Sequence, residues 1–146
     1  MAEWHNHSGG HVPENAVHGG DDVNDEDLYV GRVWENGDLI PGKIVPSHGV
    51  CYVAYGGNEL AHQSYEVLVH HGKWKWKDAE DGKVPKRAIQ GGHTSSGEPL
   101  YIGRSKYSGS KVIGKVHPSH KVLYVPFGGK EVSIDEYEVL CEKKPK

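Results

Sequence analysis

Residues Tyr52–Leu68 read YVAYGGNELAHQSYEVL, and residues Tyr124–Leu140 read YVPFGGKEVSIDEYEVL. The two stretches follow one pattern 72 positions apart, and the same shift aligns the chain without a gap over the whole of Trp4–Val69. Self-similarity at a fixed period is typical of chains built from repeated structural units. The sequence therefore predicts two units of one fold, a first repeat over residues 4–75 and a second repeat over residues 76–146.

Local sequence predicts strands throughout both repeats. Short segments rich in Val, Ile and Tyr, such as LYVGRV at 28–33 and VCYVAY at 50–55, end at Gly, Pro or Asn-Gly. This composition is typical of strands, and the Asn36-Gly37 pair between two of them predicts a tight hairpin. No window has apolar residues spaced at three and four, so we expect little or no helix. The predicted fold class is all-β.

Length, composition and charge limit the possible classes of function. The chain has 146 residues, of which 36% are hydrophobic and 25% charged, and a formal net charge of −3. That composition fits a globular body with a modest core, and the charge gives no basic surface for nucleic acid. No apolar run approaches the roughly 20 residues of a membrane span, and the N-terminus has no apolar secretory signal. We expect no nucleic-acid binding, no membrane insertion and a cytoplasmic location, with release by a non-classical route as an alternative.

The segment Tyr65–Trp76 is long for a strand and contains the junction between the repeats. Leu68, His70, Trp74 and Trp76 would lie on one face if the segment were extended throughout. Each repeat alone is too small to bury much core. We therefore expect two β-units related by a pseudo-twofold axis, which share this long central strand and one hydrophobic core.

Several repeated or aligned residues have a structural explanation. The pairs Gly56-Gly57 and Gly128-Gly129 fit turns that need positive φ. Cys51 and Cys141 align with a valine or a leucine in the other repeat, so they fit small buried apolar side chains better than a disulfide.

One arginine and one lysine are also retained at equivalent positions of both repeats. Arg32 is expected to pair with a repeated carboxylate, either Glu59 or Glu66. Lys43 and Lys115 each follow a glycine inside an apolar strand, where packing alone does not require lysine twice. A repeated salt bridge and contact with a ligand are equal alternatives for these two lysines.

The residues that differ between the repeats point to a binding site. After Gly19-Gly20 the first repeat carries Asp21-Asp22, whereas the second repeat carries His93-Thr94 at the same place. A carboxylate beside an ammonium suits a neutral polyol, because the carboxylate accepts from two vicinal hydroxyls while lysine donates. The second repeat keeps the donor and loses the strong acceptor, which indicates a weaker or different site. The candidate carbohydrate-binding residues are Asp22, Lys43, Asp21 and Lys115.

Metal binding and catalysis find little support in the sequence. The acidic stretch Asp21–Asp27 lacks the central glycine and terminal glutamate of a helix–loop–helix calcium loop. Four histidines near the N-terminus could bind zinc, but no second ligand cluster accompanies them: His5, His7, His11 and His18. The chain has no nucleophile elbow and no phosphate loop, and whether Asp22 and Glu59 have the spacing of a glycosidase pair cannot be read from sequence. We predict no metal, no cofactor and no enzymatic activity.

These motifs resemble a known family. VPENAV before Gly-Gly, LYVGR at 28–32, the stretch GDLIPGKIVPSHGVCYVAYGG at 37–57 and the repeated YEVL are similar to the DM-nine repeat of insects, molluscs and natterin-like fish toxins. The resemblance covers nearly the whole chain, because the motif set occurs once in each repeat. A pair of such repeats without a pore-forming domain resembles the mannose-binding DM-nine lectins of bivalves. The resemblance implies sugar contacts from Asp22 and Lys43, and Thr94 in the second repeat departs from that pattern.

Two classes of function follow from these observations. The first is a calcium-independent lectin for mannose-type glycans on microbial surfaces, which acts in innate recognition and agglutination as a homodimer. The second is a non-catalytic module that binds protein or lipid, in which the repeated lysines are only structural.

Overall fold

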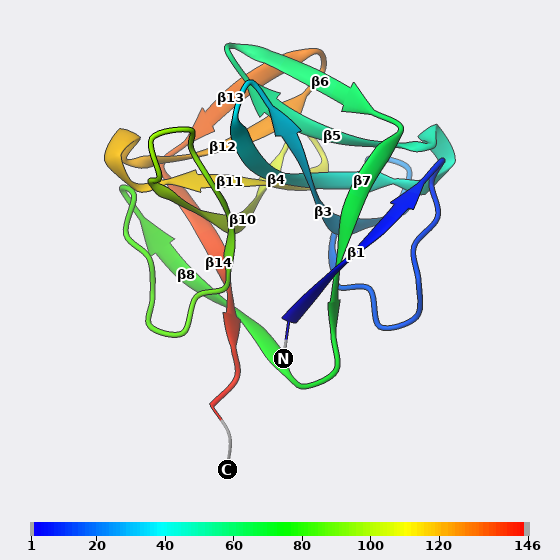
Figure 1. The fold of residues 1–146 in the computed structure, drawn as a ribbon. Coiled ribbons are helices and arrows are strands. Elements are labelled where there is room, and N and C mark those ends of the chain that lie inside the picture. Colours follow the sequence, from blue (N-terminus) through cyan, green and yellow to red (C-terminus); the bar gives the residue numbers. More distant parts are fainter. Residues whose placement is uncertain (1, 145–146) are drawn as a thin grey trace.

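The computed structural model describes residues 2–144, which form fourteen strands and two three-residue 3-10 turns (Figure 1). Residues 145–146, the end of the predicted second repeat, lie outside this range. In chain order the elements are β1 (Ala2–Ser8), β2 (His18–Asp21), β3 (Asp27–Glu35), β4 (Asp38–Val45), η1 (Pro46–His48), β5 (Val50–Tyr55), β6 (Asn58–His62), β7 (Ser64–His70), β8 (Trp74–Glu80), β9 (Gln90–His93), β10 (Pro99–Tyr107), β11 (Ser110–His117), η2 (Pro118–His120), β12 (Val122–Phe127), β13 (Lys130–Ile134) and β14 (Glu136–Glu142). The all-β prediction is confirmed. Neither helical turn in the described range is long or apolar enough to cross a membrane.

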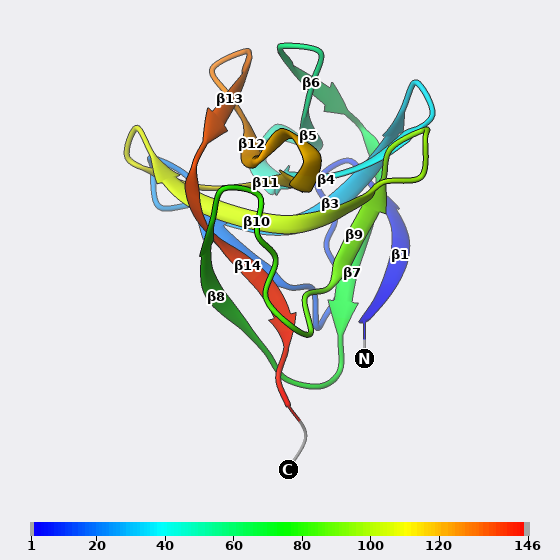
Figure 2. The same cartoon turned by 90° about the vertical axis from the view of Figure 1, so that its left-hand side faces the viewer.

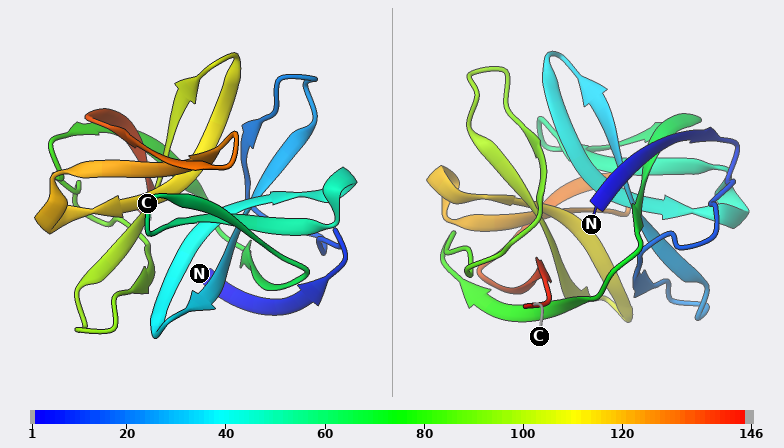
Figure 3. Two further views of the ribbon diagram at one scale, coloured as in Figure 1. Left: turned by 90° about the horizontal axis from the view of Figure 1, so that it is seen from above. Right: turned by 60° about the horizontal axis from the view of Figure 1, so that its bottom comes forward.

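The strand order has the symmetry that the internal repeat predicts. The strands form one sheet in the order β1-β7-β3-β2-β11-β12-β13-β6-β5-β4-β9-β10-β14-β8. Each strand of the first repeat has its counterpart seven strands later in the chain, so that β1 corresponds to β8 and β7 to β14. When every strand is replaced by its counterpart, the order becomes the same order read from the opposite end. The centre of the order is the pairing of β13 with β6, where Lys130 lies opposite Asn58. The pseudo-twofold axis therefore passes between these two strands, as the view from above shows (Figure 3).

Six strands close a ring that belongs to both repeats. Strands β2, β3, β4, β9, β10 and β11 each pair with the next, and β11 pairs back with β2. Within this ring, the two pairings that join one repeat to the other are Asp21 opposite Lys111 and Leu39 opposite His93. A Cβ at Gly20 would lie 2.1 Å from the Lys111 carbonyl oxygen. The repeated Gly-Gly pairs in β2 and β9 are thus required by the close approach of one repeat to the other.

The hydrophobic core has a shared centre and two flanking parts. The shared cluster takes its buried side chains from both repeats: Val17, Leu28, Val30, Val45, Leu68, Ile89, Ile102, Ile113 and Leu140. One flanking cluster around Ile44 belongs to the first repeat, and another around Val116 belongs to the second. The expected common core is present, because the closed ring encloses side chains that neither repeat could cover alone.

The expected single strand across the junction is divided in two. β7 ends at His70 and β8 begins at Trp74, and the link between them crosses the base of the molecule (Figure 2). Each part is held by a different partner, because β7 pairs with β1 and β8 pairs with β14. Gly72 donates its N–H to Nδ1 of the buried His70 over 2.9 Å. The chain therefore bends where one ladder ends and the other begins, which period-two patterning does not reveal.

The local turn and cysteine predictions are also confirmed. Asn36 and Gly37 have φ of 47° and 85° and join β3 to β4 in the predicted hairpin. Gly57 at the β5–β6 turn has φ of 88°, a conformation that favours glycine. Cys51 and Cys141 are buried free thiols, and burial raises the pKa of both.

Candidate functional site

The two repeated lysines lie on the most deeply buried strands of the sheet. Lys43 on β4 pairs with Val30 of β3 on one side and with Tyr52 of β5 on the other. Lys115 occupies the same place on β11. Both lysine side chains are only 6% exposed. An ammonium so deeply placed must be paired, because an isolated buried charge is costly.

Each lysine forms an ion pair with a glutamate of its own repeat. Lys43 Nζ lies 3.5 Å from Glu59 Oε2, and Lys115 Nζ lies 3.2 Å from Glu131 Oε2. The glutamate side chains are 13% exposed. The repeated salt bridge, one of the two alternatives for these lysines, is therefore present.

The same glutamates connect the repeats across the pseudo-twofold axis. The second carboxylate oxygen, Oε1, accepts the backbone N–H of a glycine in the other repeat: Gly129 donates to Glu59 over 2.9 Å, and Gly57 donates to Glu131 over 3.0 Å. These glycines form the tips of the β12–β13 and β5–β6 hairpins, which lie side by side at the top of the molecule (Figure 1). Each glutamate thus bridges its lysine and the opposite hairpin.

Aromatic rings from both repeats cover each ammonium. Lys43 Nζ lies 5.5 Å from the ring centroid of Tyr52 in its own repeat and 5.2 Å from that of Phe127 in the other. Lys115 has equivalent neighbours, one of them Tyr55 at 5.6 Å. Cations within about 6 Å of a ring centroid are attracted to the ring. Two lysine sites therefore lie near the axis, each built from both repeats.

The charge of Asp22 acts on the first of these sites. Burial lowers the pKa of Lys43, and the charges of Glu59 and Asp22 act in the opposite direction. The loop that carries Asp22 is fixed by Glu26, whose carboxylate accepts the N–H and the hydroxyl of Ser47 over 2.7 and 2.5 Å. The Asp22 carboxylate thus lies on a loop of defined conformation, near enough for its charge to act on Lys43.

The remaining two candidates lie elsewhere. Asp21 Oδ1 lies 3.3 Å from Nε2 of His18, and its carboxylate has no part in the surroundings of Lys43. Lys115 belongs to the second site, where Thr94 replaces the aspartate. The Thr94 hydroxyl accepts the N–H of Glu98 over 3.1 Å. The candidates therefore separate into one site with an acidic loop and one site without it.

The second site carries a histidine pair that the first site lacks. His117 replaces Val45, and its ring stacks on His120 with centroids 3.6 Å apart. Its Nδ1 lies 3.6 Å from Glu98 Oε2. Burial lowers the pKa of His117; the charges of His120 and Lys115 lower it further, while Glu98 and Asp38 oppose them. The two sites thus differ in charge and in their response to pH.

Sequence reasoning missed Glu59 and Tyr52 as parts of the site. Tyr52 contacts His48 through a 2.8 Å hydrogen bond between its hydroxyl and Nδ1, and burial with the nearby charges of Glu59 and Asp22 raises the pKa of its phenol. The tyrosine, the histidine and the glutamate recur in both repeats, and this repetition was the only sequence feature that could have marked them as candidate site residues. It could not show that they converge on the lysine.

The repeated arginine has a separate structural role. Arg32 Nε donates to Glu66 over 2.6 Å, its guanidinium lies 4.0 Å from the ring centroid of Trp4, and Nη1 donates to the Gly91 carbonyl of the other repeat over 3.3 Å. Of the two carboxylates considered, Glu66 is the partner and Glu59 is not. The arginine stabilises the junction between repeats and leaves Glu59 to the lysine.

A symmetric all-β body with charged sites built at the contact of its two repeats defines a binding module. The family described as DM9 repeat matches residues 1–62 and 22–134. The chain belongs to the DM9 repeat family, and this membership indicates a binding module.

Two relatives from the fish Thalassophryne nattereri match this chain over part of their own length. Natterin-4 is 33% identical over 136 residues, which cover 90% of this chain and 32% of natterin-4. Natterin-3 is 36% identical over 93 residues, which cover 62% of this chain and 23% of natterin-3. The chain thus spans a third or less of the length of these relatives.

A solved structure shares the fold. The nematode sperm cell motility protein MFP2B superimposes with a TM-score of 0.76 at 18% identity, over 99% of this chain and 47% of that protein. At this identity the likeness concerns the fold alone.

Proposed function

We propose that this protein is a calcium-independent lectin that binds mannose-type glycans at Asp22 and Lys43. The observation that carries the proposal is the unused hydrogen-bonding capacity beside an acidic loop. An ammonium has three donors, and among the described residues Glu59 Oε2 is the only acceptor within ion-pair distance of Lys43 Nζ. Asp22 provides acceptor oxygens for ligand hydroxyls at the same place.

The chemistry of this pair suits a vicinal diol. A carboxylate accepts from two neighbouring hydroxyls, and an ammonium donates to a hydroxyl or ring oxygen. The faces of Tyr52 and Phe127 line the same site and offer apolar surface to the C–H groups of a sugar. The resemblance to bivalve lectins supports mannose as the sugar.

The two repeats should differ in affinity. Thr94 replaces Asp22, and its hydroxyl is engaged by Glu98 and Ser96. A neutral hydroxyl is also a weaker acceptor than a carboxylate. We therefore assign the stronger site to the first repeat and a weaker one to the second.

Recognition of a microbial surface would need several sites at once. A monosaccharide buries little apolar area, and its well-hydrated hydroxyls must be desolvated, so single-site affinity is expected to be weak. A homodimer is the simplest way to present more sites, and avidity then raises the overall affinity. We propose a homodimer that agglutinates mannan-bearing cells in innate recognition.

A second function is favoured by the burial of the lysines. Side chains that are 6% exposed and paired with a glutamate fit a purely structural role. The protein would then be a non-catalytic module that binds protein or lipid through another surface. The absence of detectable binding to any sugar on a glycan array would favour this alternative.

The experiment compares variants of the acidic loop. Asp22→Asn keeps the shape of the side chain and its bond from the Val23 N–H, so the fold should persist while mannose affinity falls by about tenfold or more in calorimetry. Thr94→Ala is the matched control and should change affinity much less. Thr94→Asp should strengthen the second site. Equal losses in Asp22→Asn and Thr94→Ala, or loss of binding in chelator that calcium restores, would refute the proposal.

A further inference from the structure

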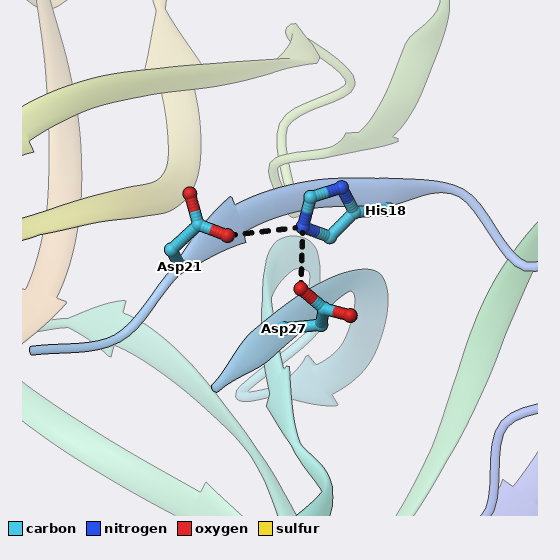
Figure 4. A group of neighbouring side chains, drawn as sticks. All are labelled: His18, Asp21 and Asp27. Carbon is cyan, nitrogen blue, oxygen red and sulfur yellow. Dashed lines mark hydrogen bonds and ion pairs between the residues drawn. The ribbon is translucent and has the colours of Figure 1, made fainter. Parts of the chain in front are cut away.

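Three side chains that could bind a metal ion meet beside the acidic loop. His18 and Asp21 lie at the two ends of β2, and Asp27 begins β3 (Figure 4). Nε2 of His18 lies 3.3 Å from Asp21 Oδ1 and 3.3 Å from Asp27 Oδ1. One potential ligand atom from each residue lies within 4.8 Å of the other two. No other such group occurs among the described residues.

The distances match the edges of a tetrahedral site. Zinc binds imidazole nitrogen and carboxylate oxygen at about 2.0–2.2 Å in tetrahedral geometry, so two neighbouring ligands lie about 3.3–3.6 Å apart. The two separations from His18, each 3.3 Å, fall at this value. Three protein ligands leave the fourth position for water. Small rotations of exposed side chains are enough to complete the geometry.

The pairing of β2 with β3 gives an independent reason for a cation. Asp21 lies directly opposite Asp27 in the ladder, and like charges at opposed positions destabilise a sheet. The second repeat has His93 opposite Pro99 at the same place, so the opposed carboxylates are specific to the first repeat. His18 packs its ring against Tyr29 with centroids 5.9 Å apart, which orients the imidazole toward the carboxylates.

We propose that His18, Asp21 and Asp27 bind a divalent transition-metal ion, with zinc as the preferred metal. An imidazole with two carboxylates favours zinc over calcium or magnesium, which prefer six or more oxygen ligands. The three side chains are about half exposed, so the ion enters from solvent and exchanges readily. The bound ion joins the two ends of the loop that carries Asp22 and so restrains that loop. This site does not depend on the proposed glycan site.

The test is a titration of the full chain with zinc chloride, followed by calorimetry. We expect one site with micromolar affinity. His18→Gln carries the residue that the second repeat has at Gln90, and it should bind zinc at least about tenfold more weakly. Zinc should raise the melting temperature of the parent chain and not that of His18→Gln. Calcium at the same concentration should do neither.

A second histidine group provides the control. His5 Nε2 lies 3.0 Å and His71 Nε2 lies 3.7 Å from Glu3 Oε1, although the three ligand atoms do not all lie within 4.8 Å of one another. These two histidines are the alternative zinc ligands to test. His5→Ala should therefore keep the parent affinity. Zinc binding that persists in His18→Gln, that disappears in His5→Ala, or that is absent from the parent chain would each overturn the proposal. Asp27→Asn, which should weaken zinc binding like His18→Gln, guards against a folding defect specific to His18→Gln.

Discussion

Replacement of Lys43 by methionine tests how far the lysine sites hold the two repeats together. Methionine keeps most of the length and the apolar stem of lysine and removes the charge. Glu59 would keep the N–H of Gly129 as a partner and would lose the ammonium 3.5 Å away. The variant therefore leaves a largely buried carboxylate half-satisfied at the contact between repeats.

The magnitude follows from this geometry. Removal of one partner of a buried ion pair costs about 3–5 kcal/mol. Because the hydrogen bond from Gly129 is kept, the carboxylate is only partly uncompensated, and the loss should lie at or below the lower end of that range. We expect a loss of about 2–3 kcal/mol in the free energy of unfolding. For a domain of this size that lowers the melting temperature by about 5–10 °C.

The assay is urea and thermal unfolding followed by circular dichroism, with Lys115→Met as the matched variant in the second repeat. The double variant Lys43→Met/Glu59→Gln should recover most of the loss, because the unpaired charge is removed as well. A melting temperature of Lys43→Met within about 1 °C of the parent would show that the ion pair contributes nothing. Failure of the double variant to recover would place the effect in packing instead of charge.

Three further results are expected. Burial and the charge of His120 lower the pKa of His117 in the folded protein. As pH falls below about 6.5, the unfolded chain therefore binds a proton at this residue more readily than the folded protein does, and the free energy of unfolding should fall. His117→Val should remove this part of the loss, as measured by urea midpoints from about pH 7.5 to 5.5. A chain cut at Gly72 should give two halves that do not fold separately, since the closed ring needs strands from both, whereas a folded half seen by circular dichroism would contradict this. Gly20→Ala should destabilise the parent by about 1–3 kcal/mol or more, because the new Cβ would lie 2.1 Å from the backbone oxygen of Lys111, and an unchanged melting temperature would show that the contact between repeats yields easily.

The prediction across the junction failed for a physical reason. The pattern of Tyr65–Trp76 continues without a break in sequence, but strands are defined by their partners as well as by their side chains. β1 pairs with β7 as far as His70, and β14 pairs with β8 from Trp74 onward. Nothing in the composition of these residues tells which partner each half will have.

The sequence by itself determined the repeated all-β units and their turns, because strand alternation, turn glycines and internal repetition are local or periodic properties. The assignment of Asp22 and Lys43 to a glycan site stays a prediction. Only the tertiary structure decided that Glu59 belongs to Lys43 and that Phe127 covers it from the other repeat. It also decided that His18 meets Asp21 and Asp27. The contacts of Glu59 and of the His18 group depend on strand register within the first repeat, and the contact of Phe127 depends on the packing of the second repeat against the first. Neither can be read from composition along the chain.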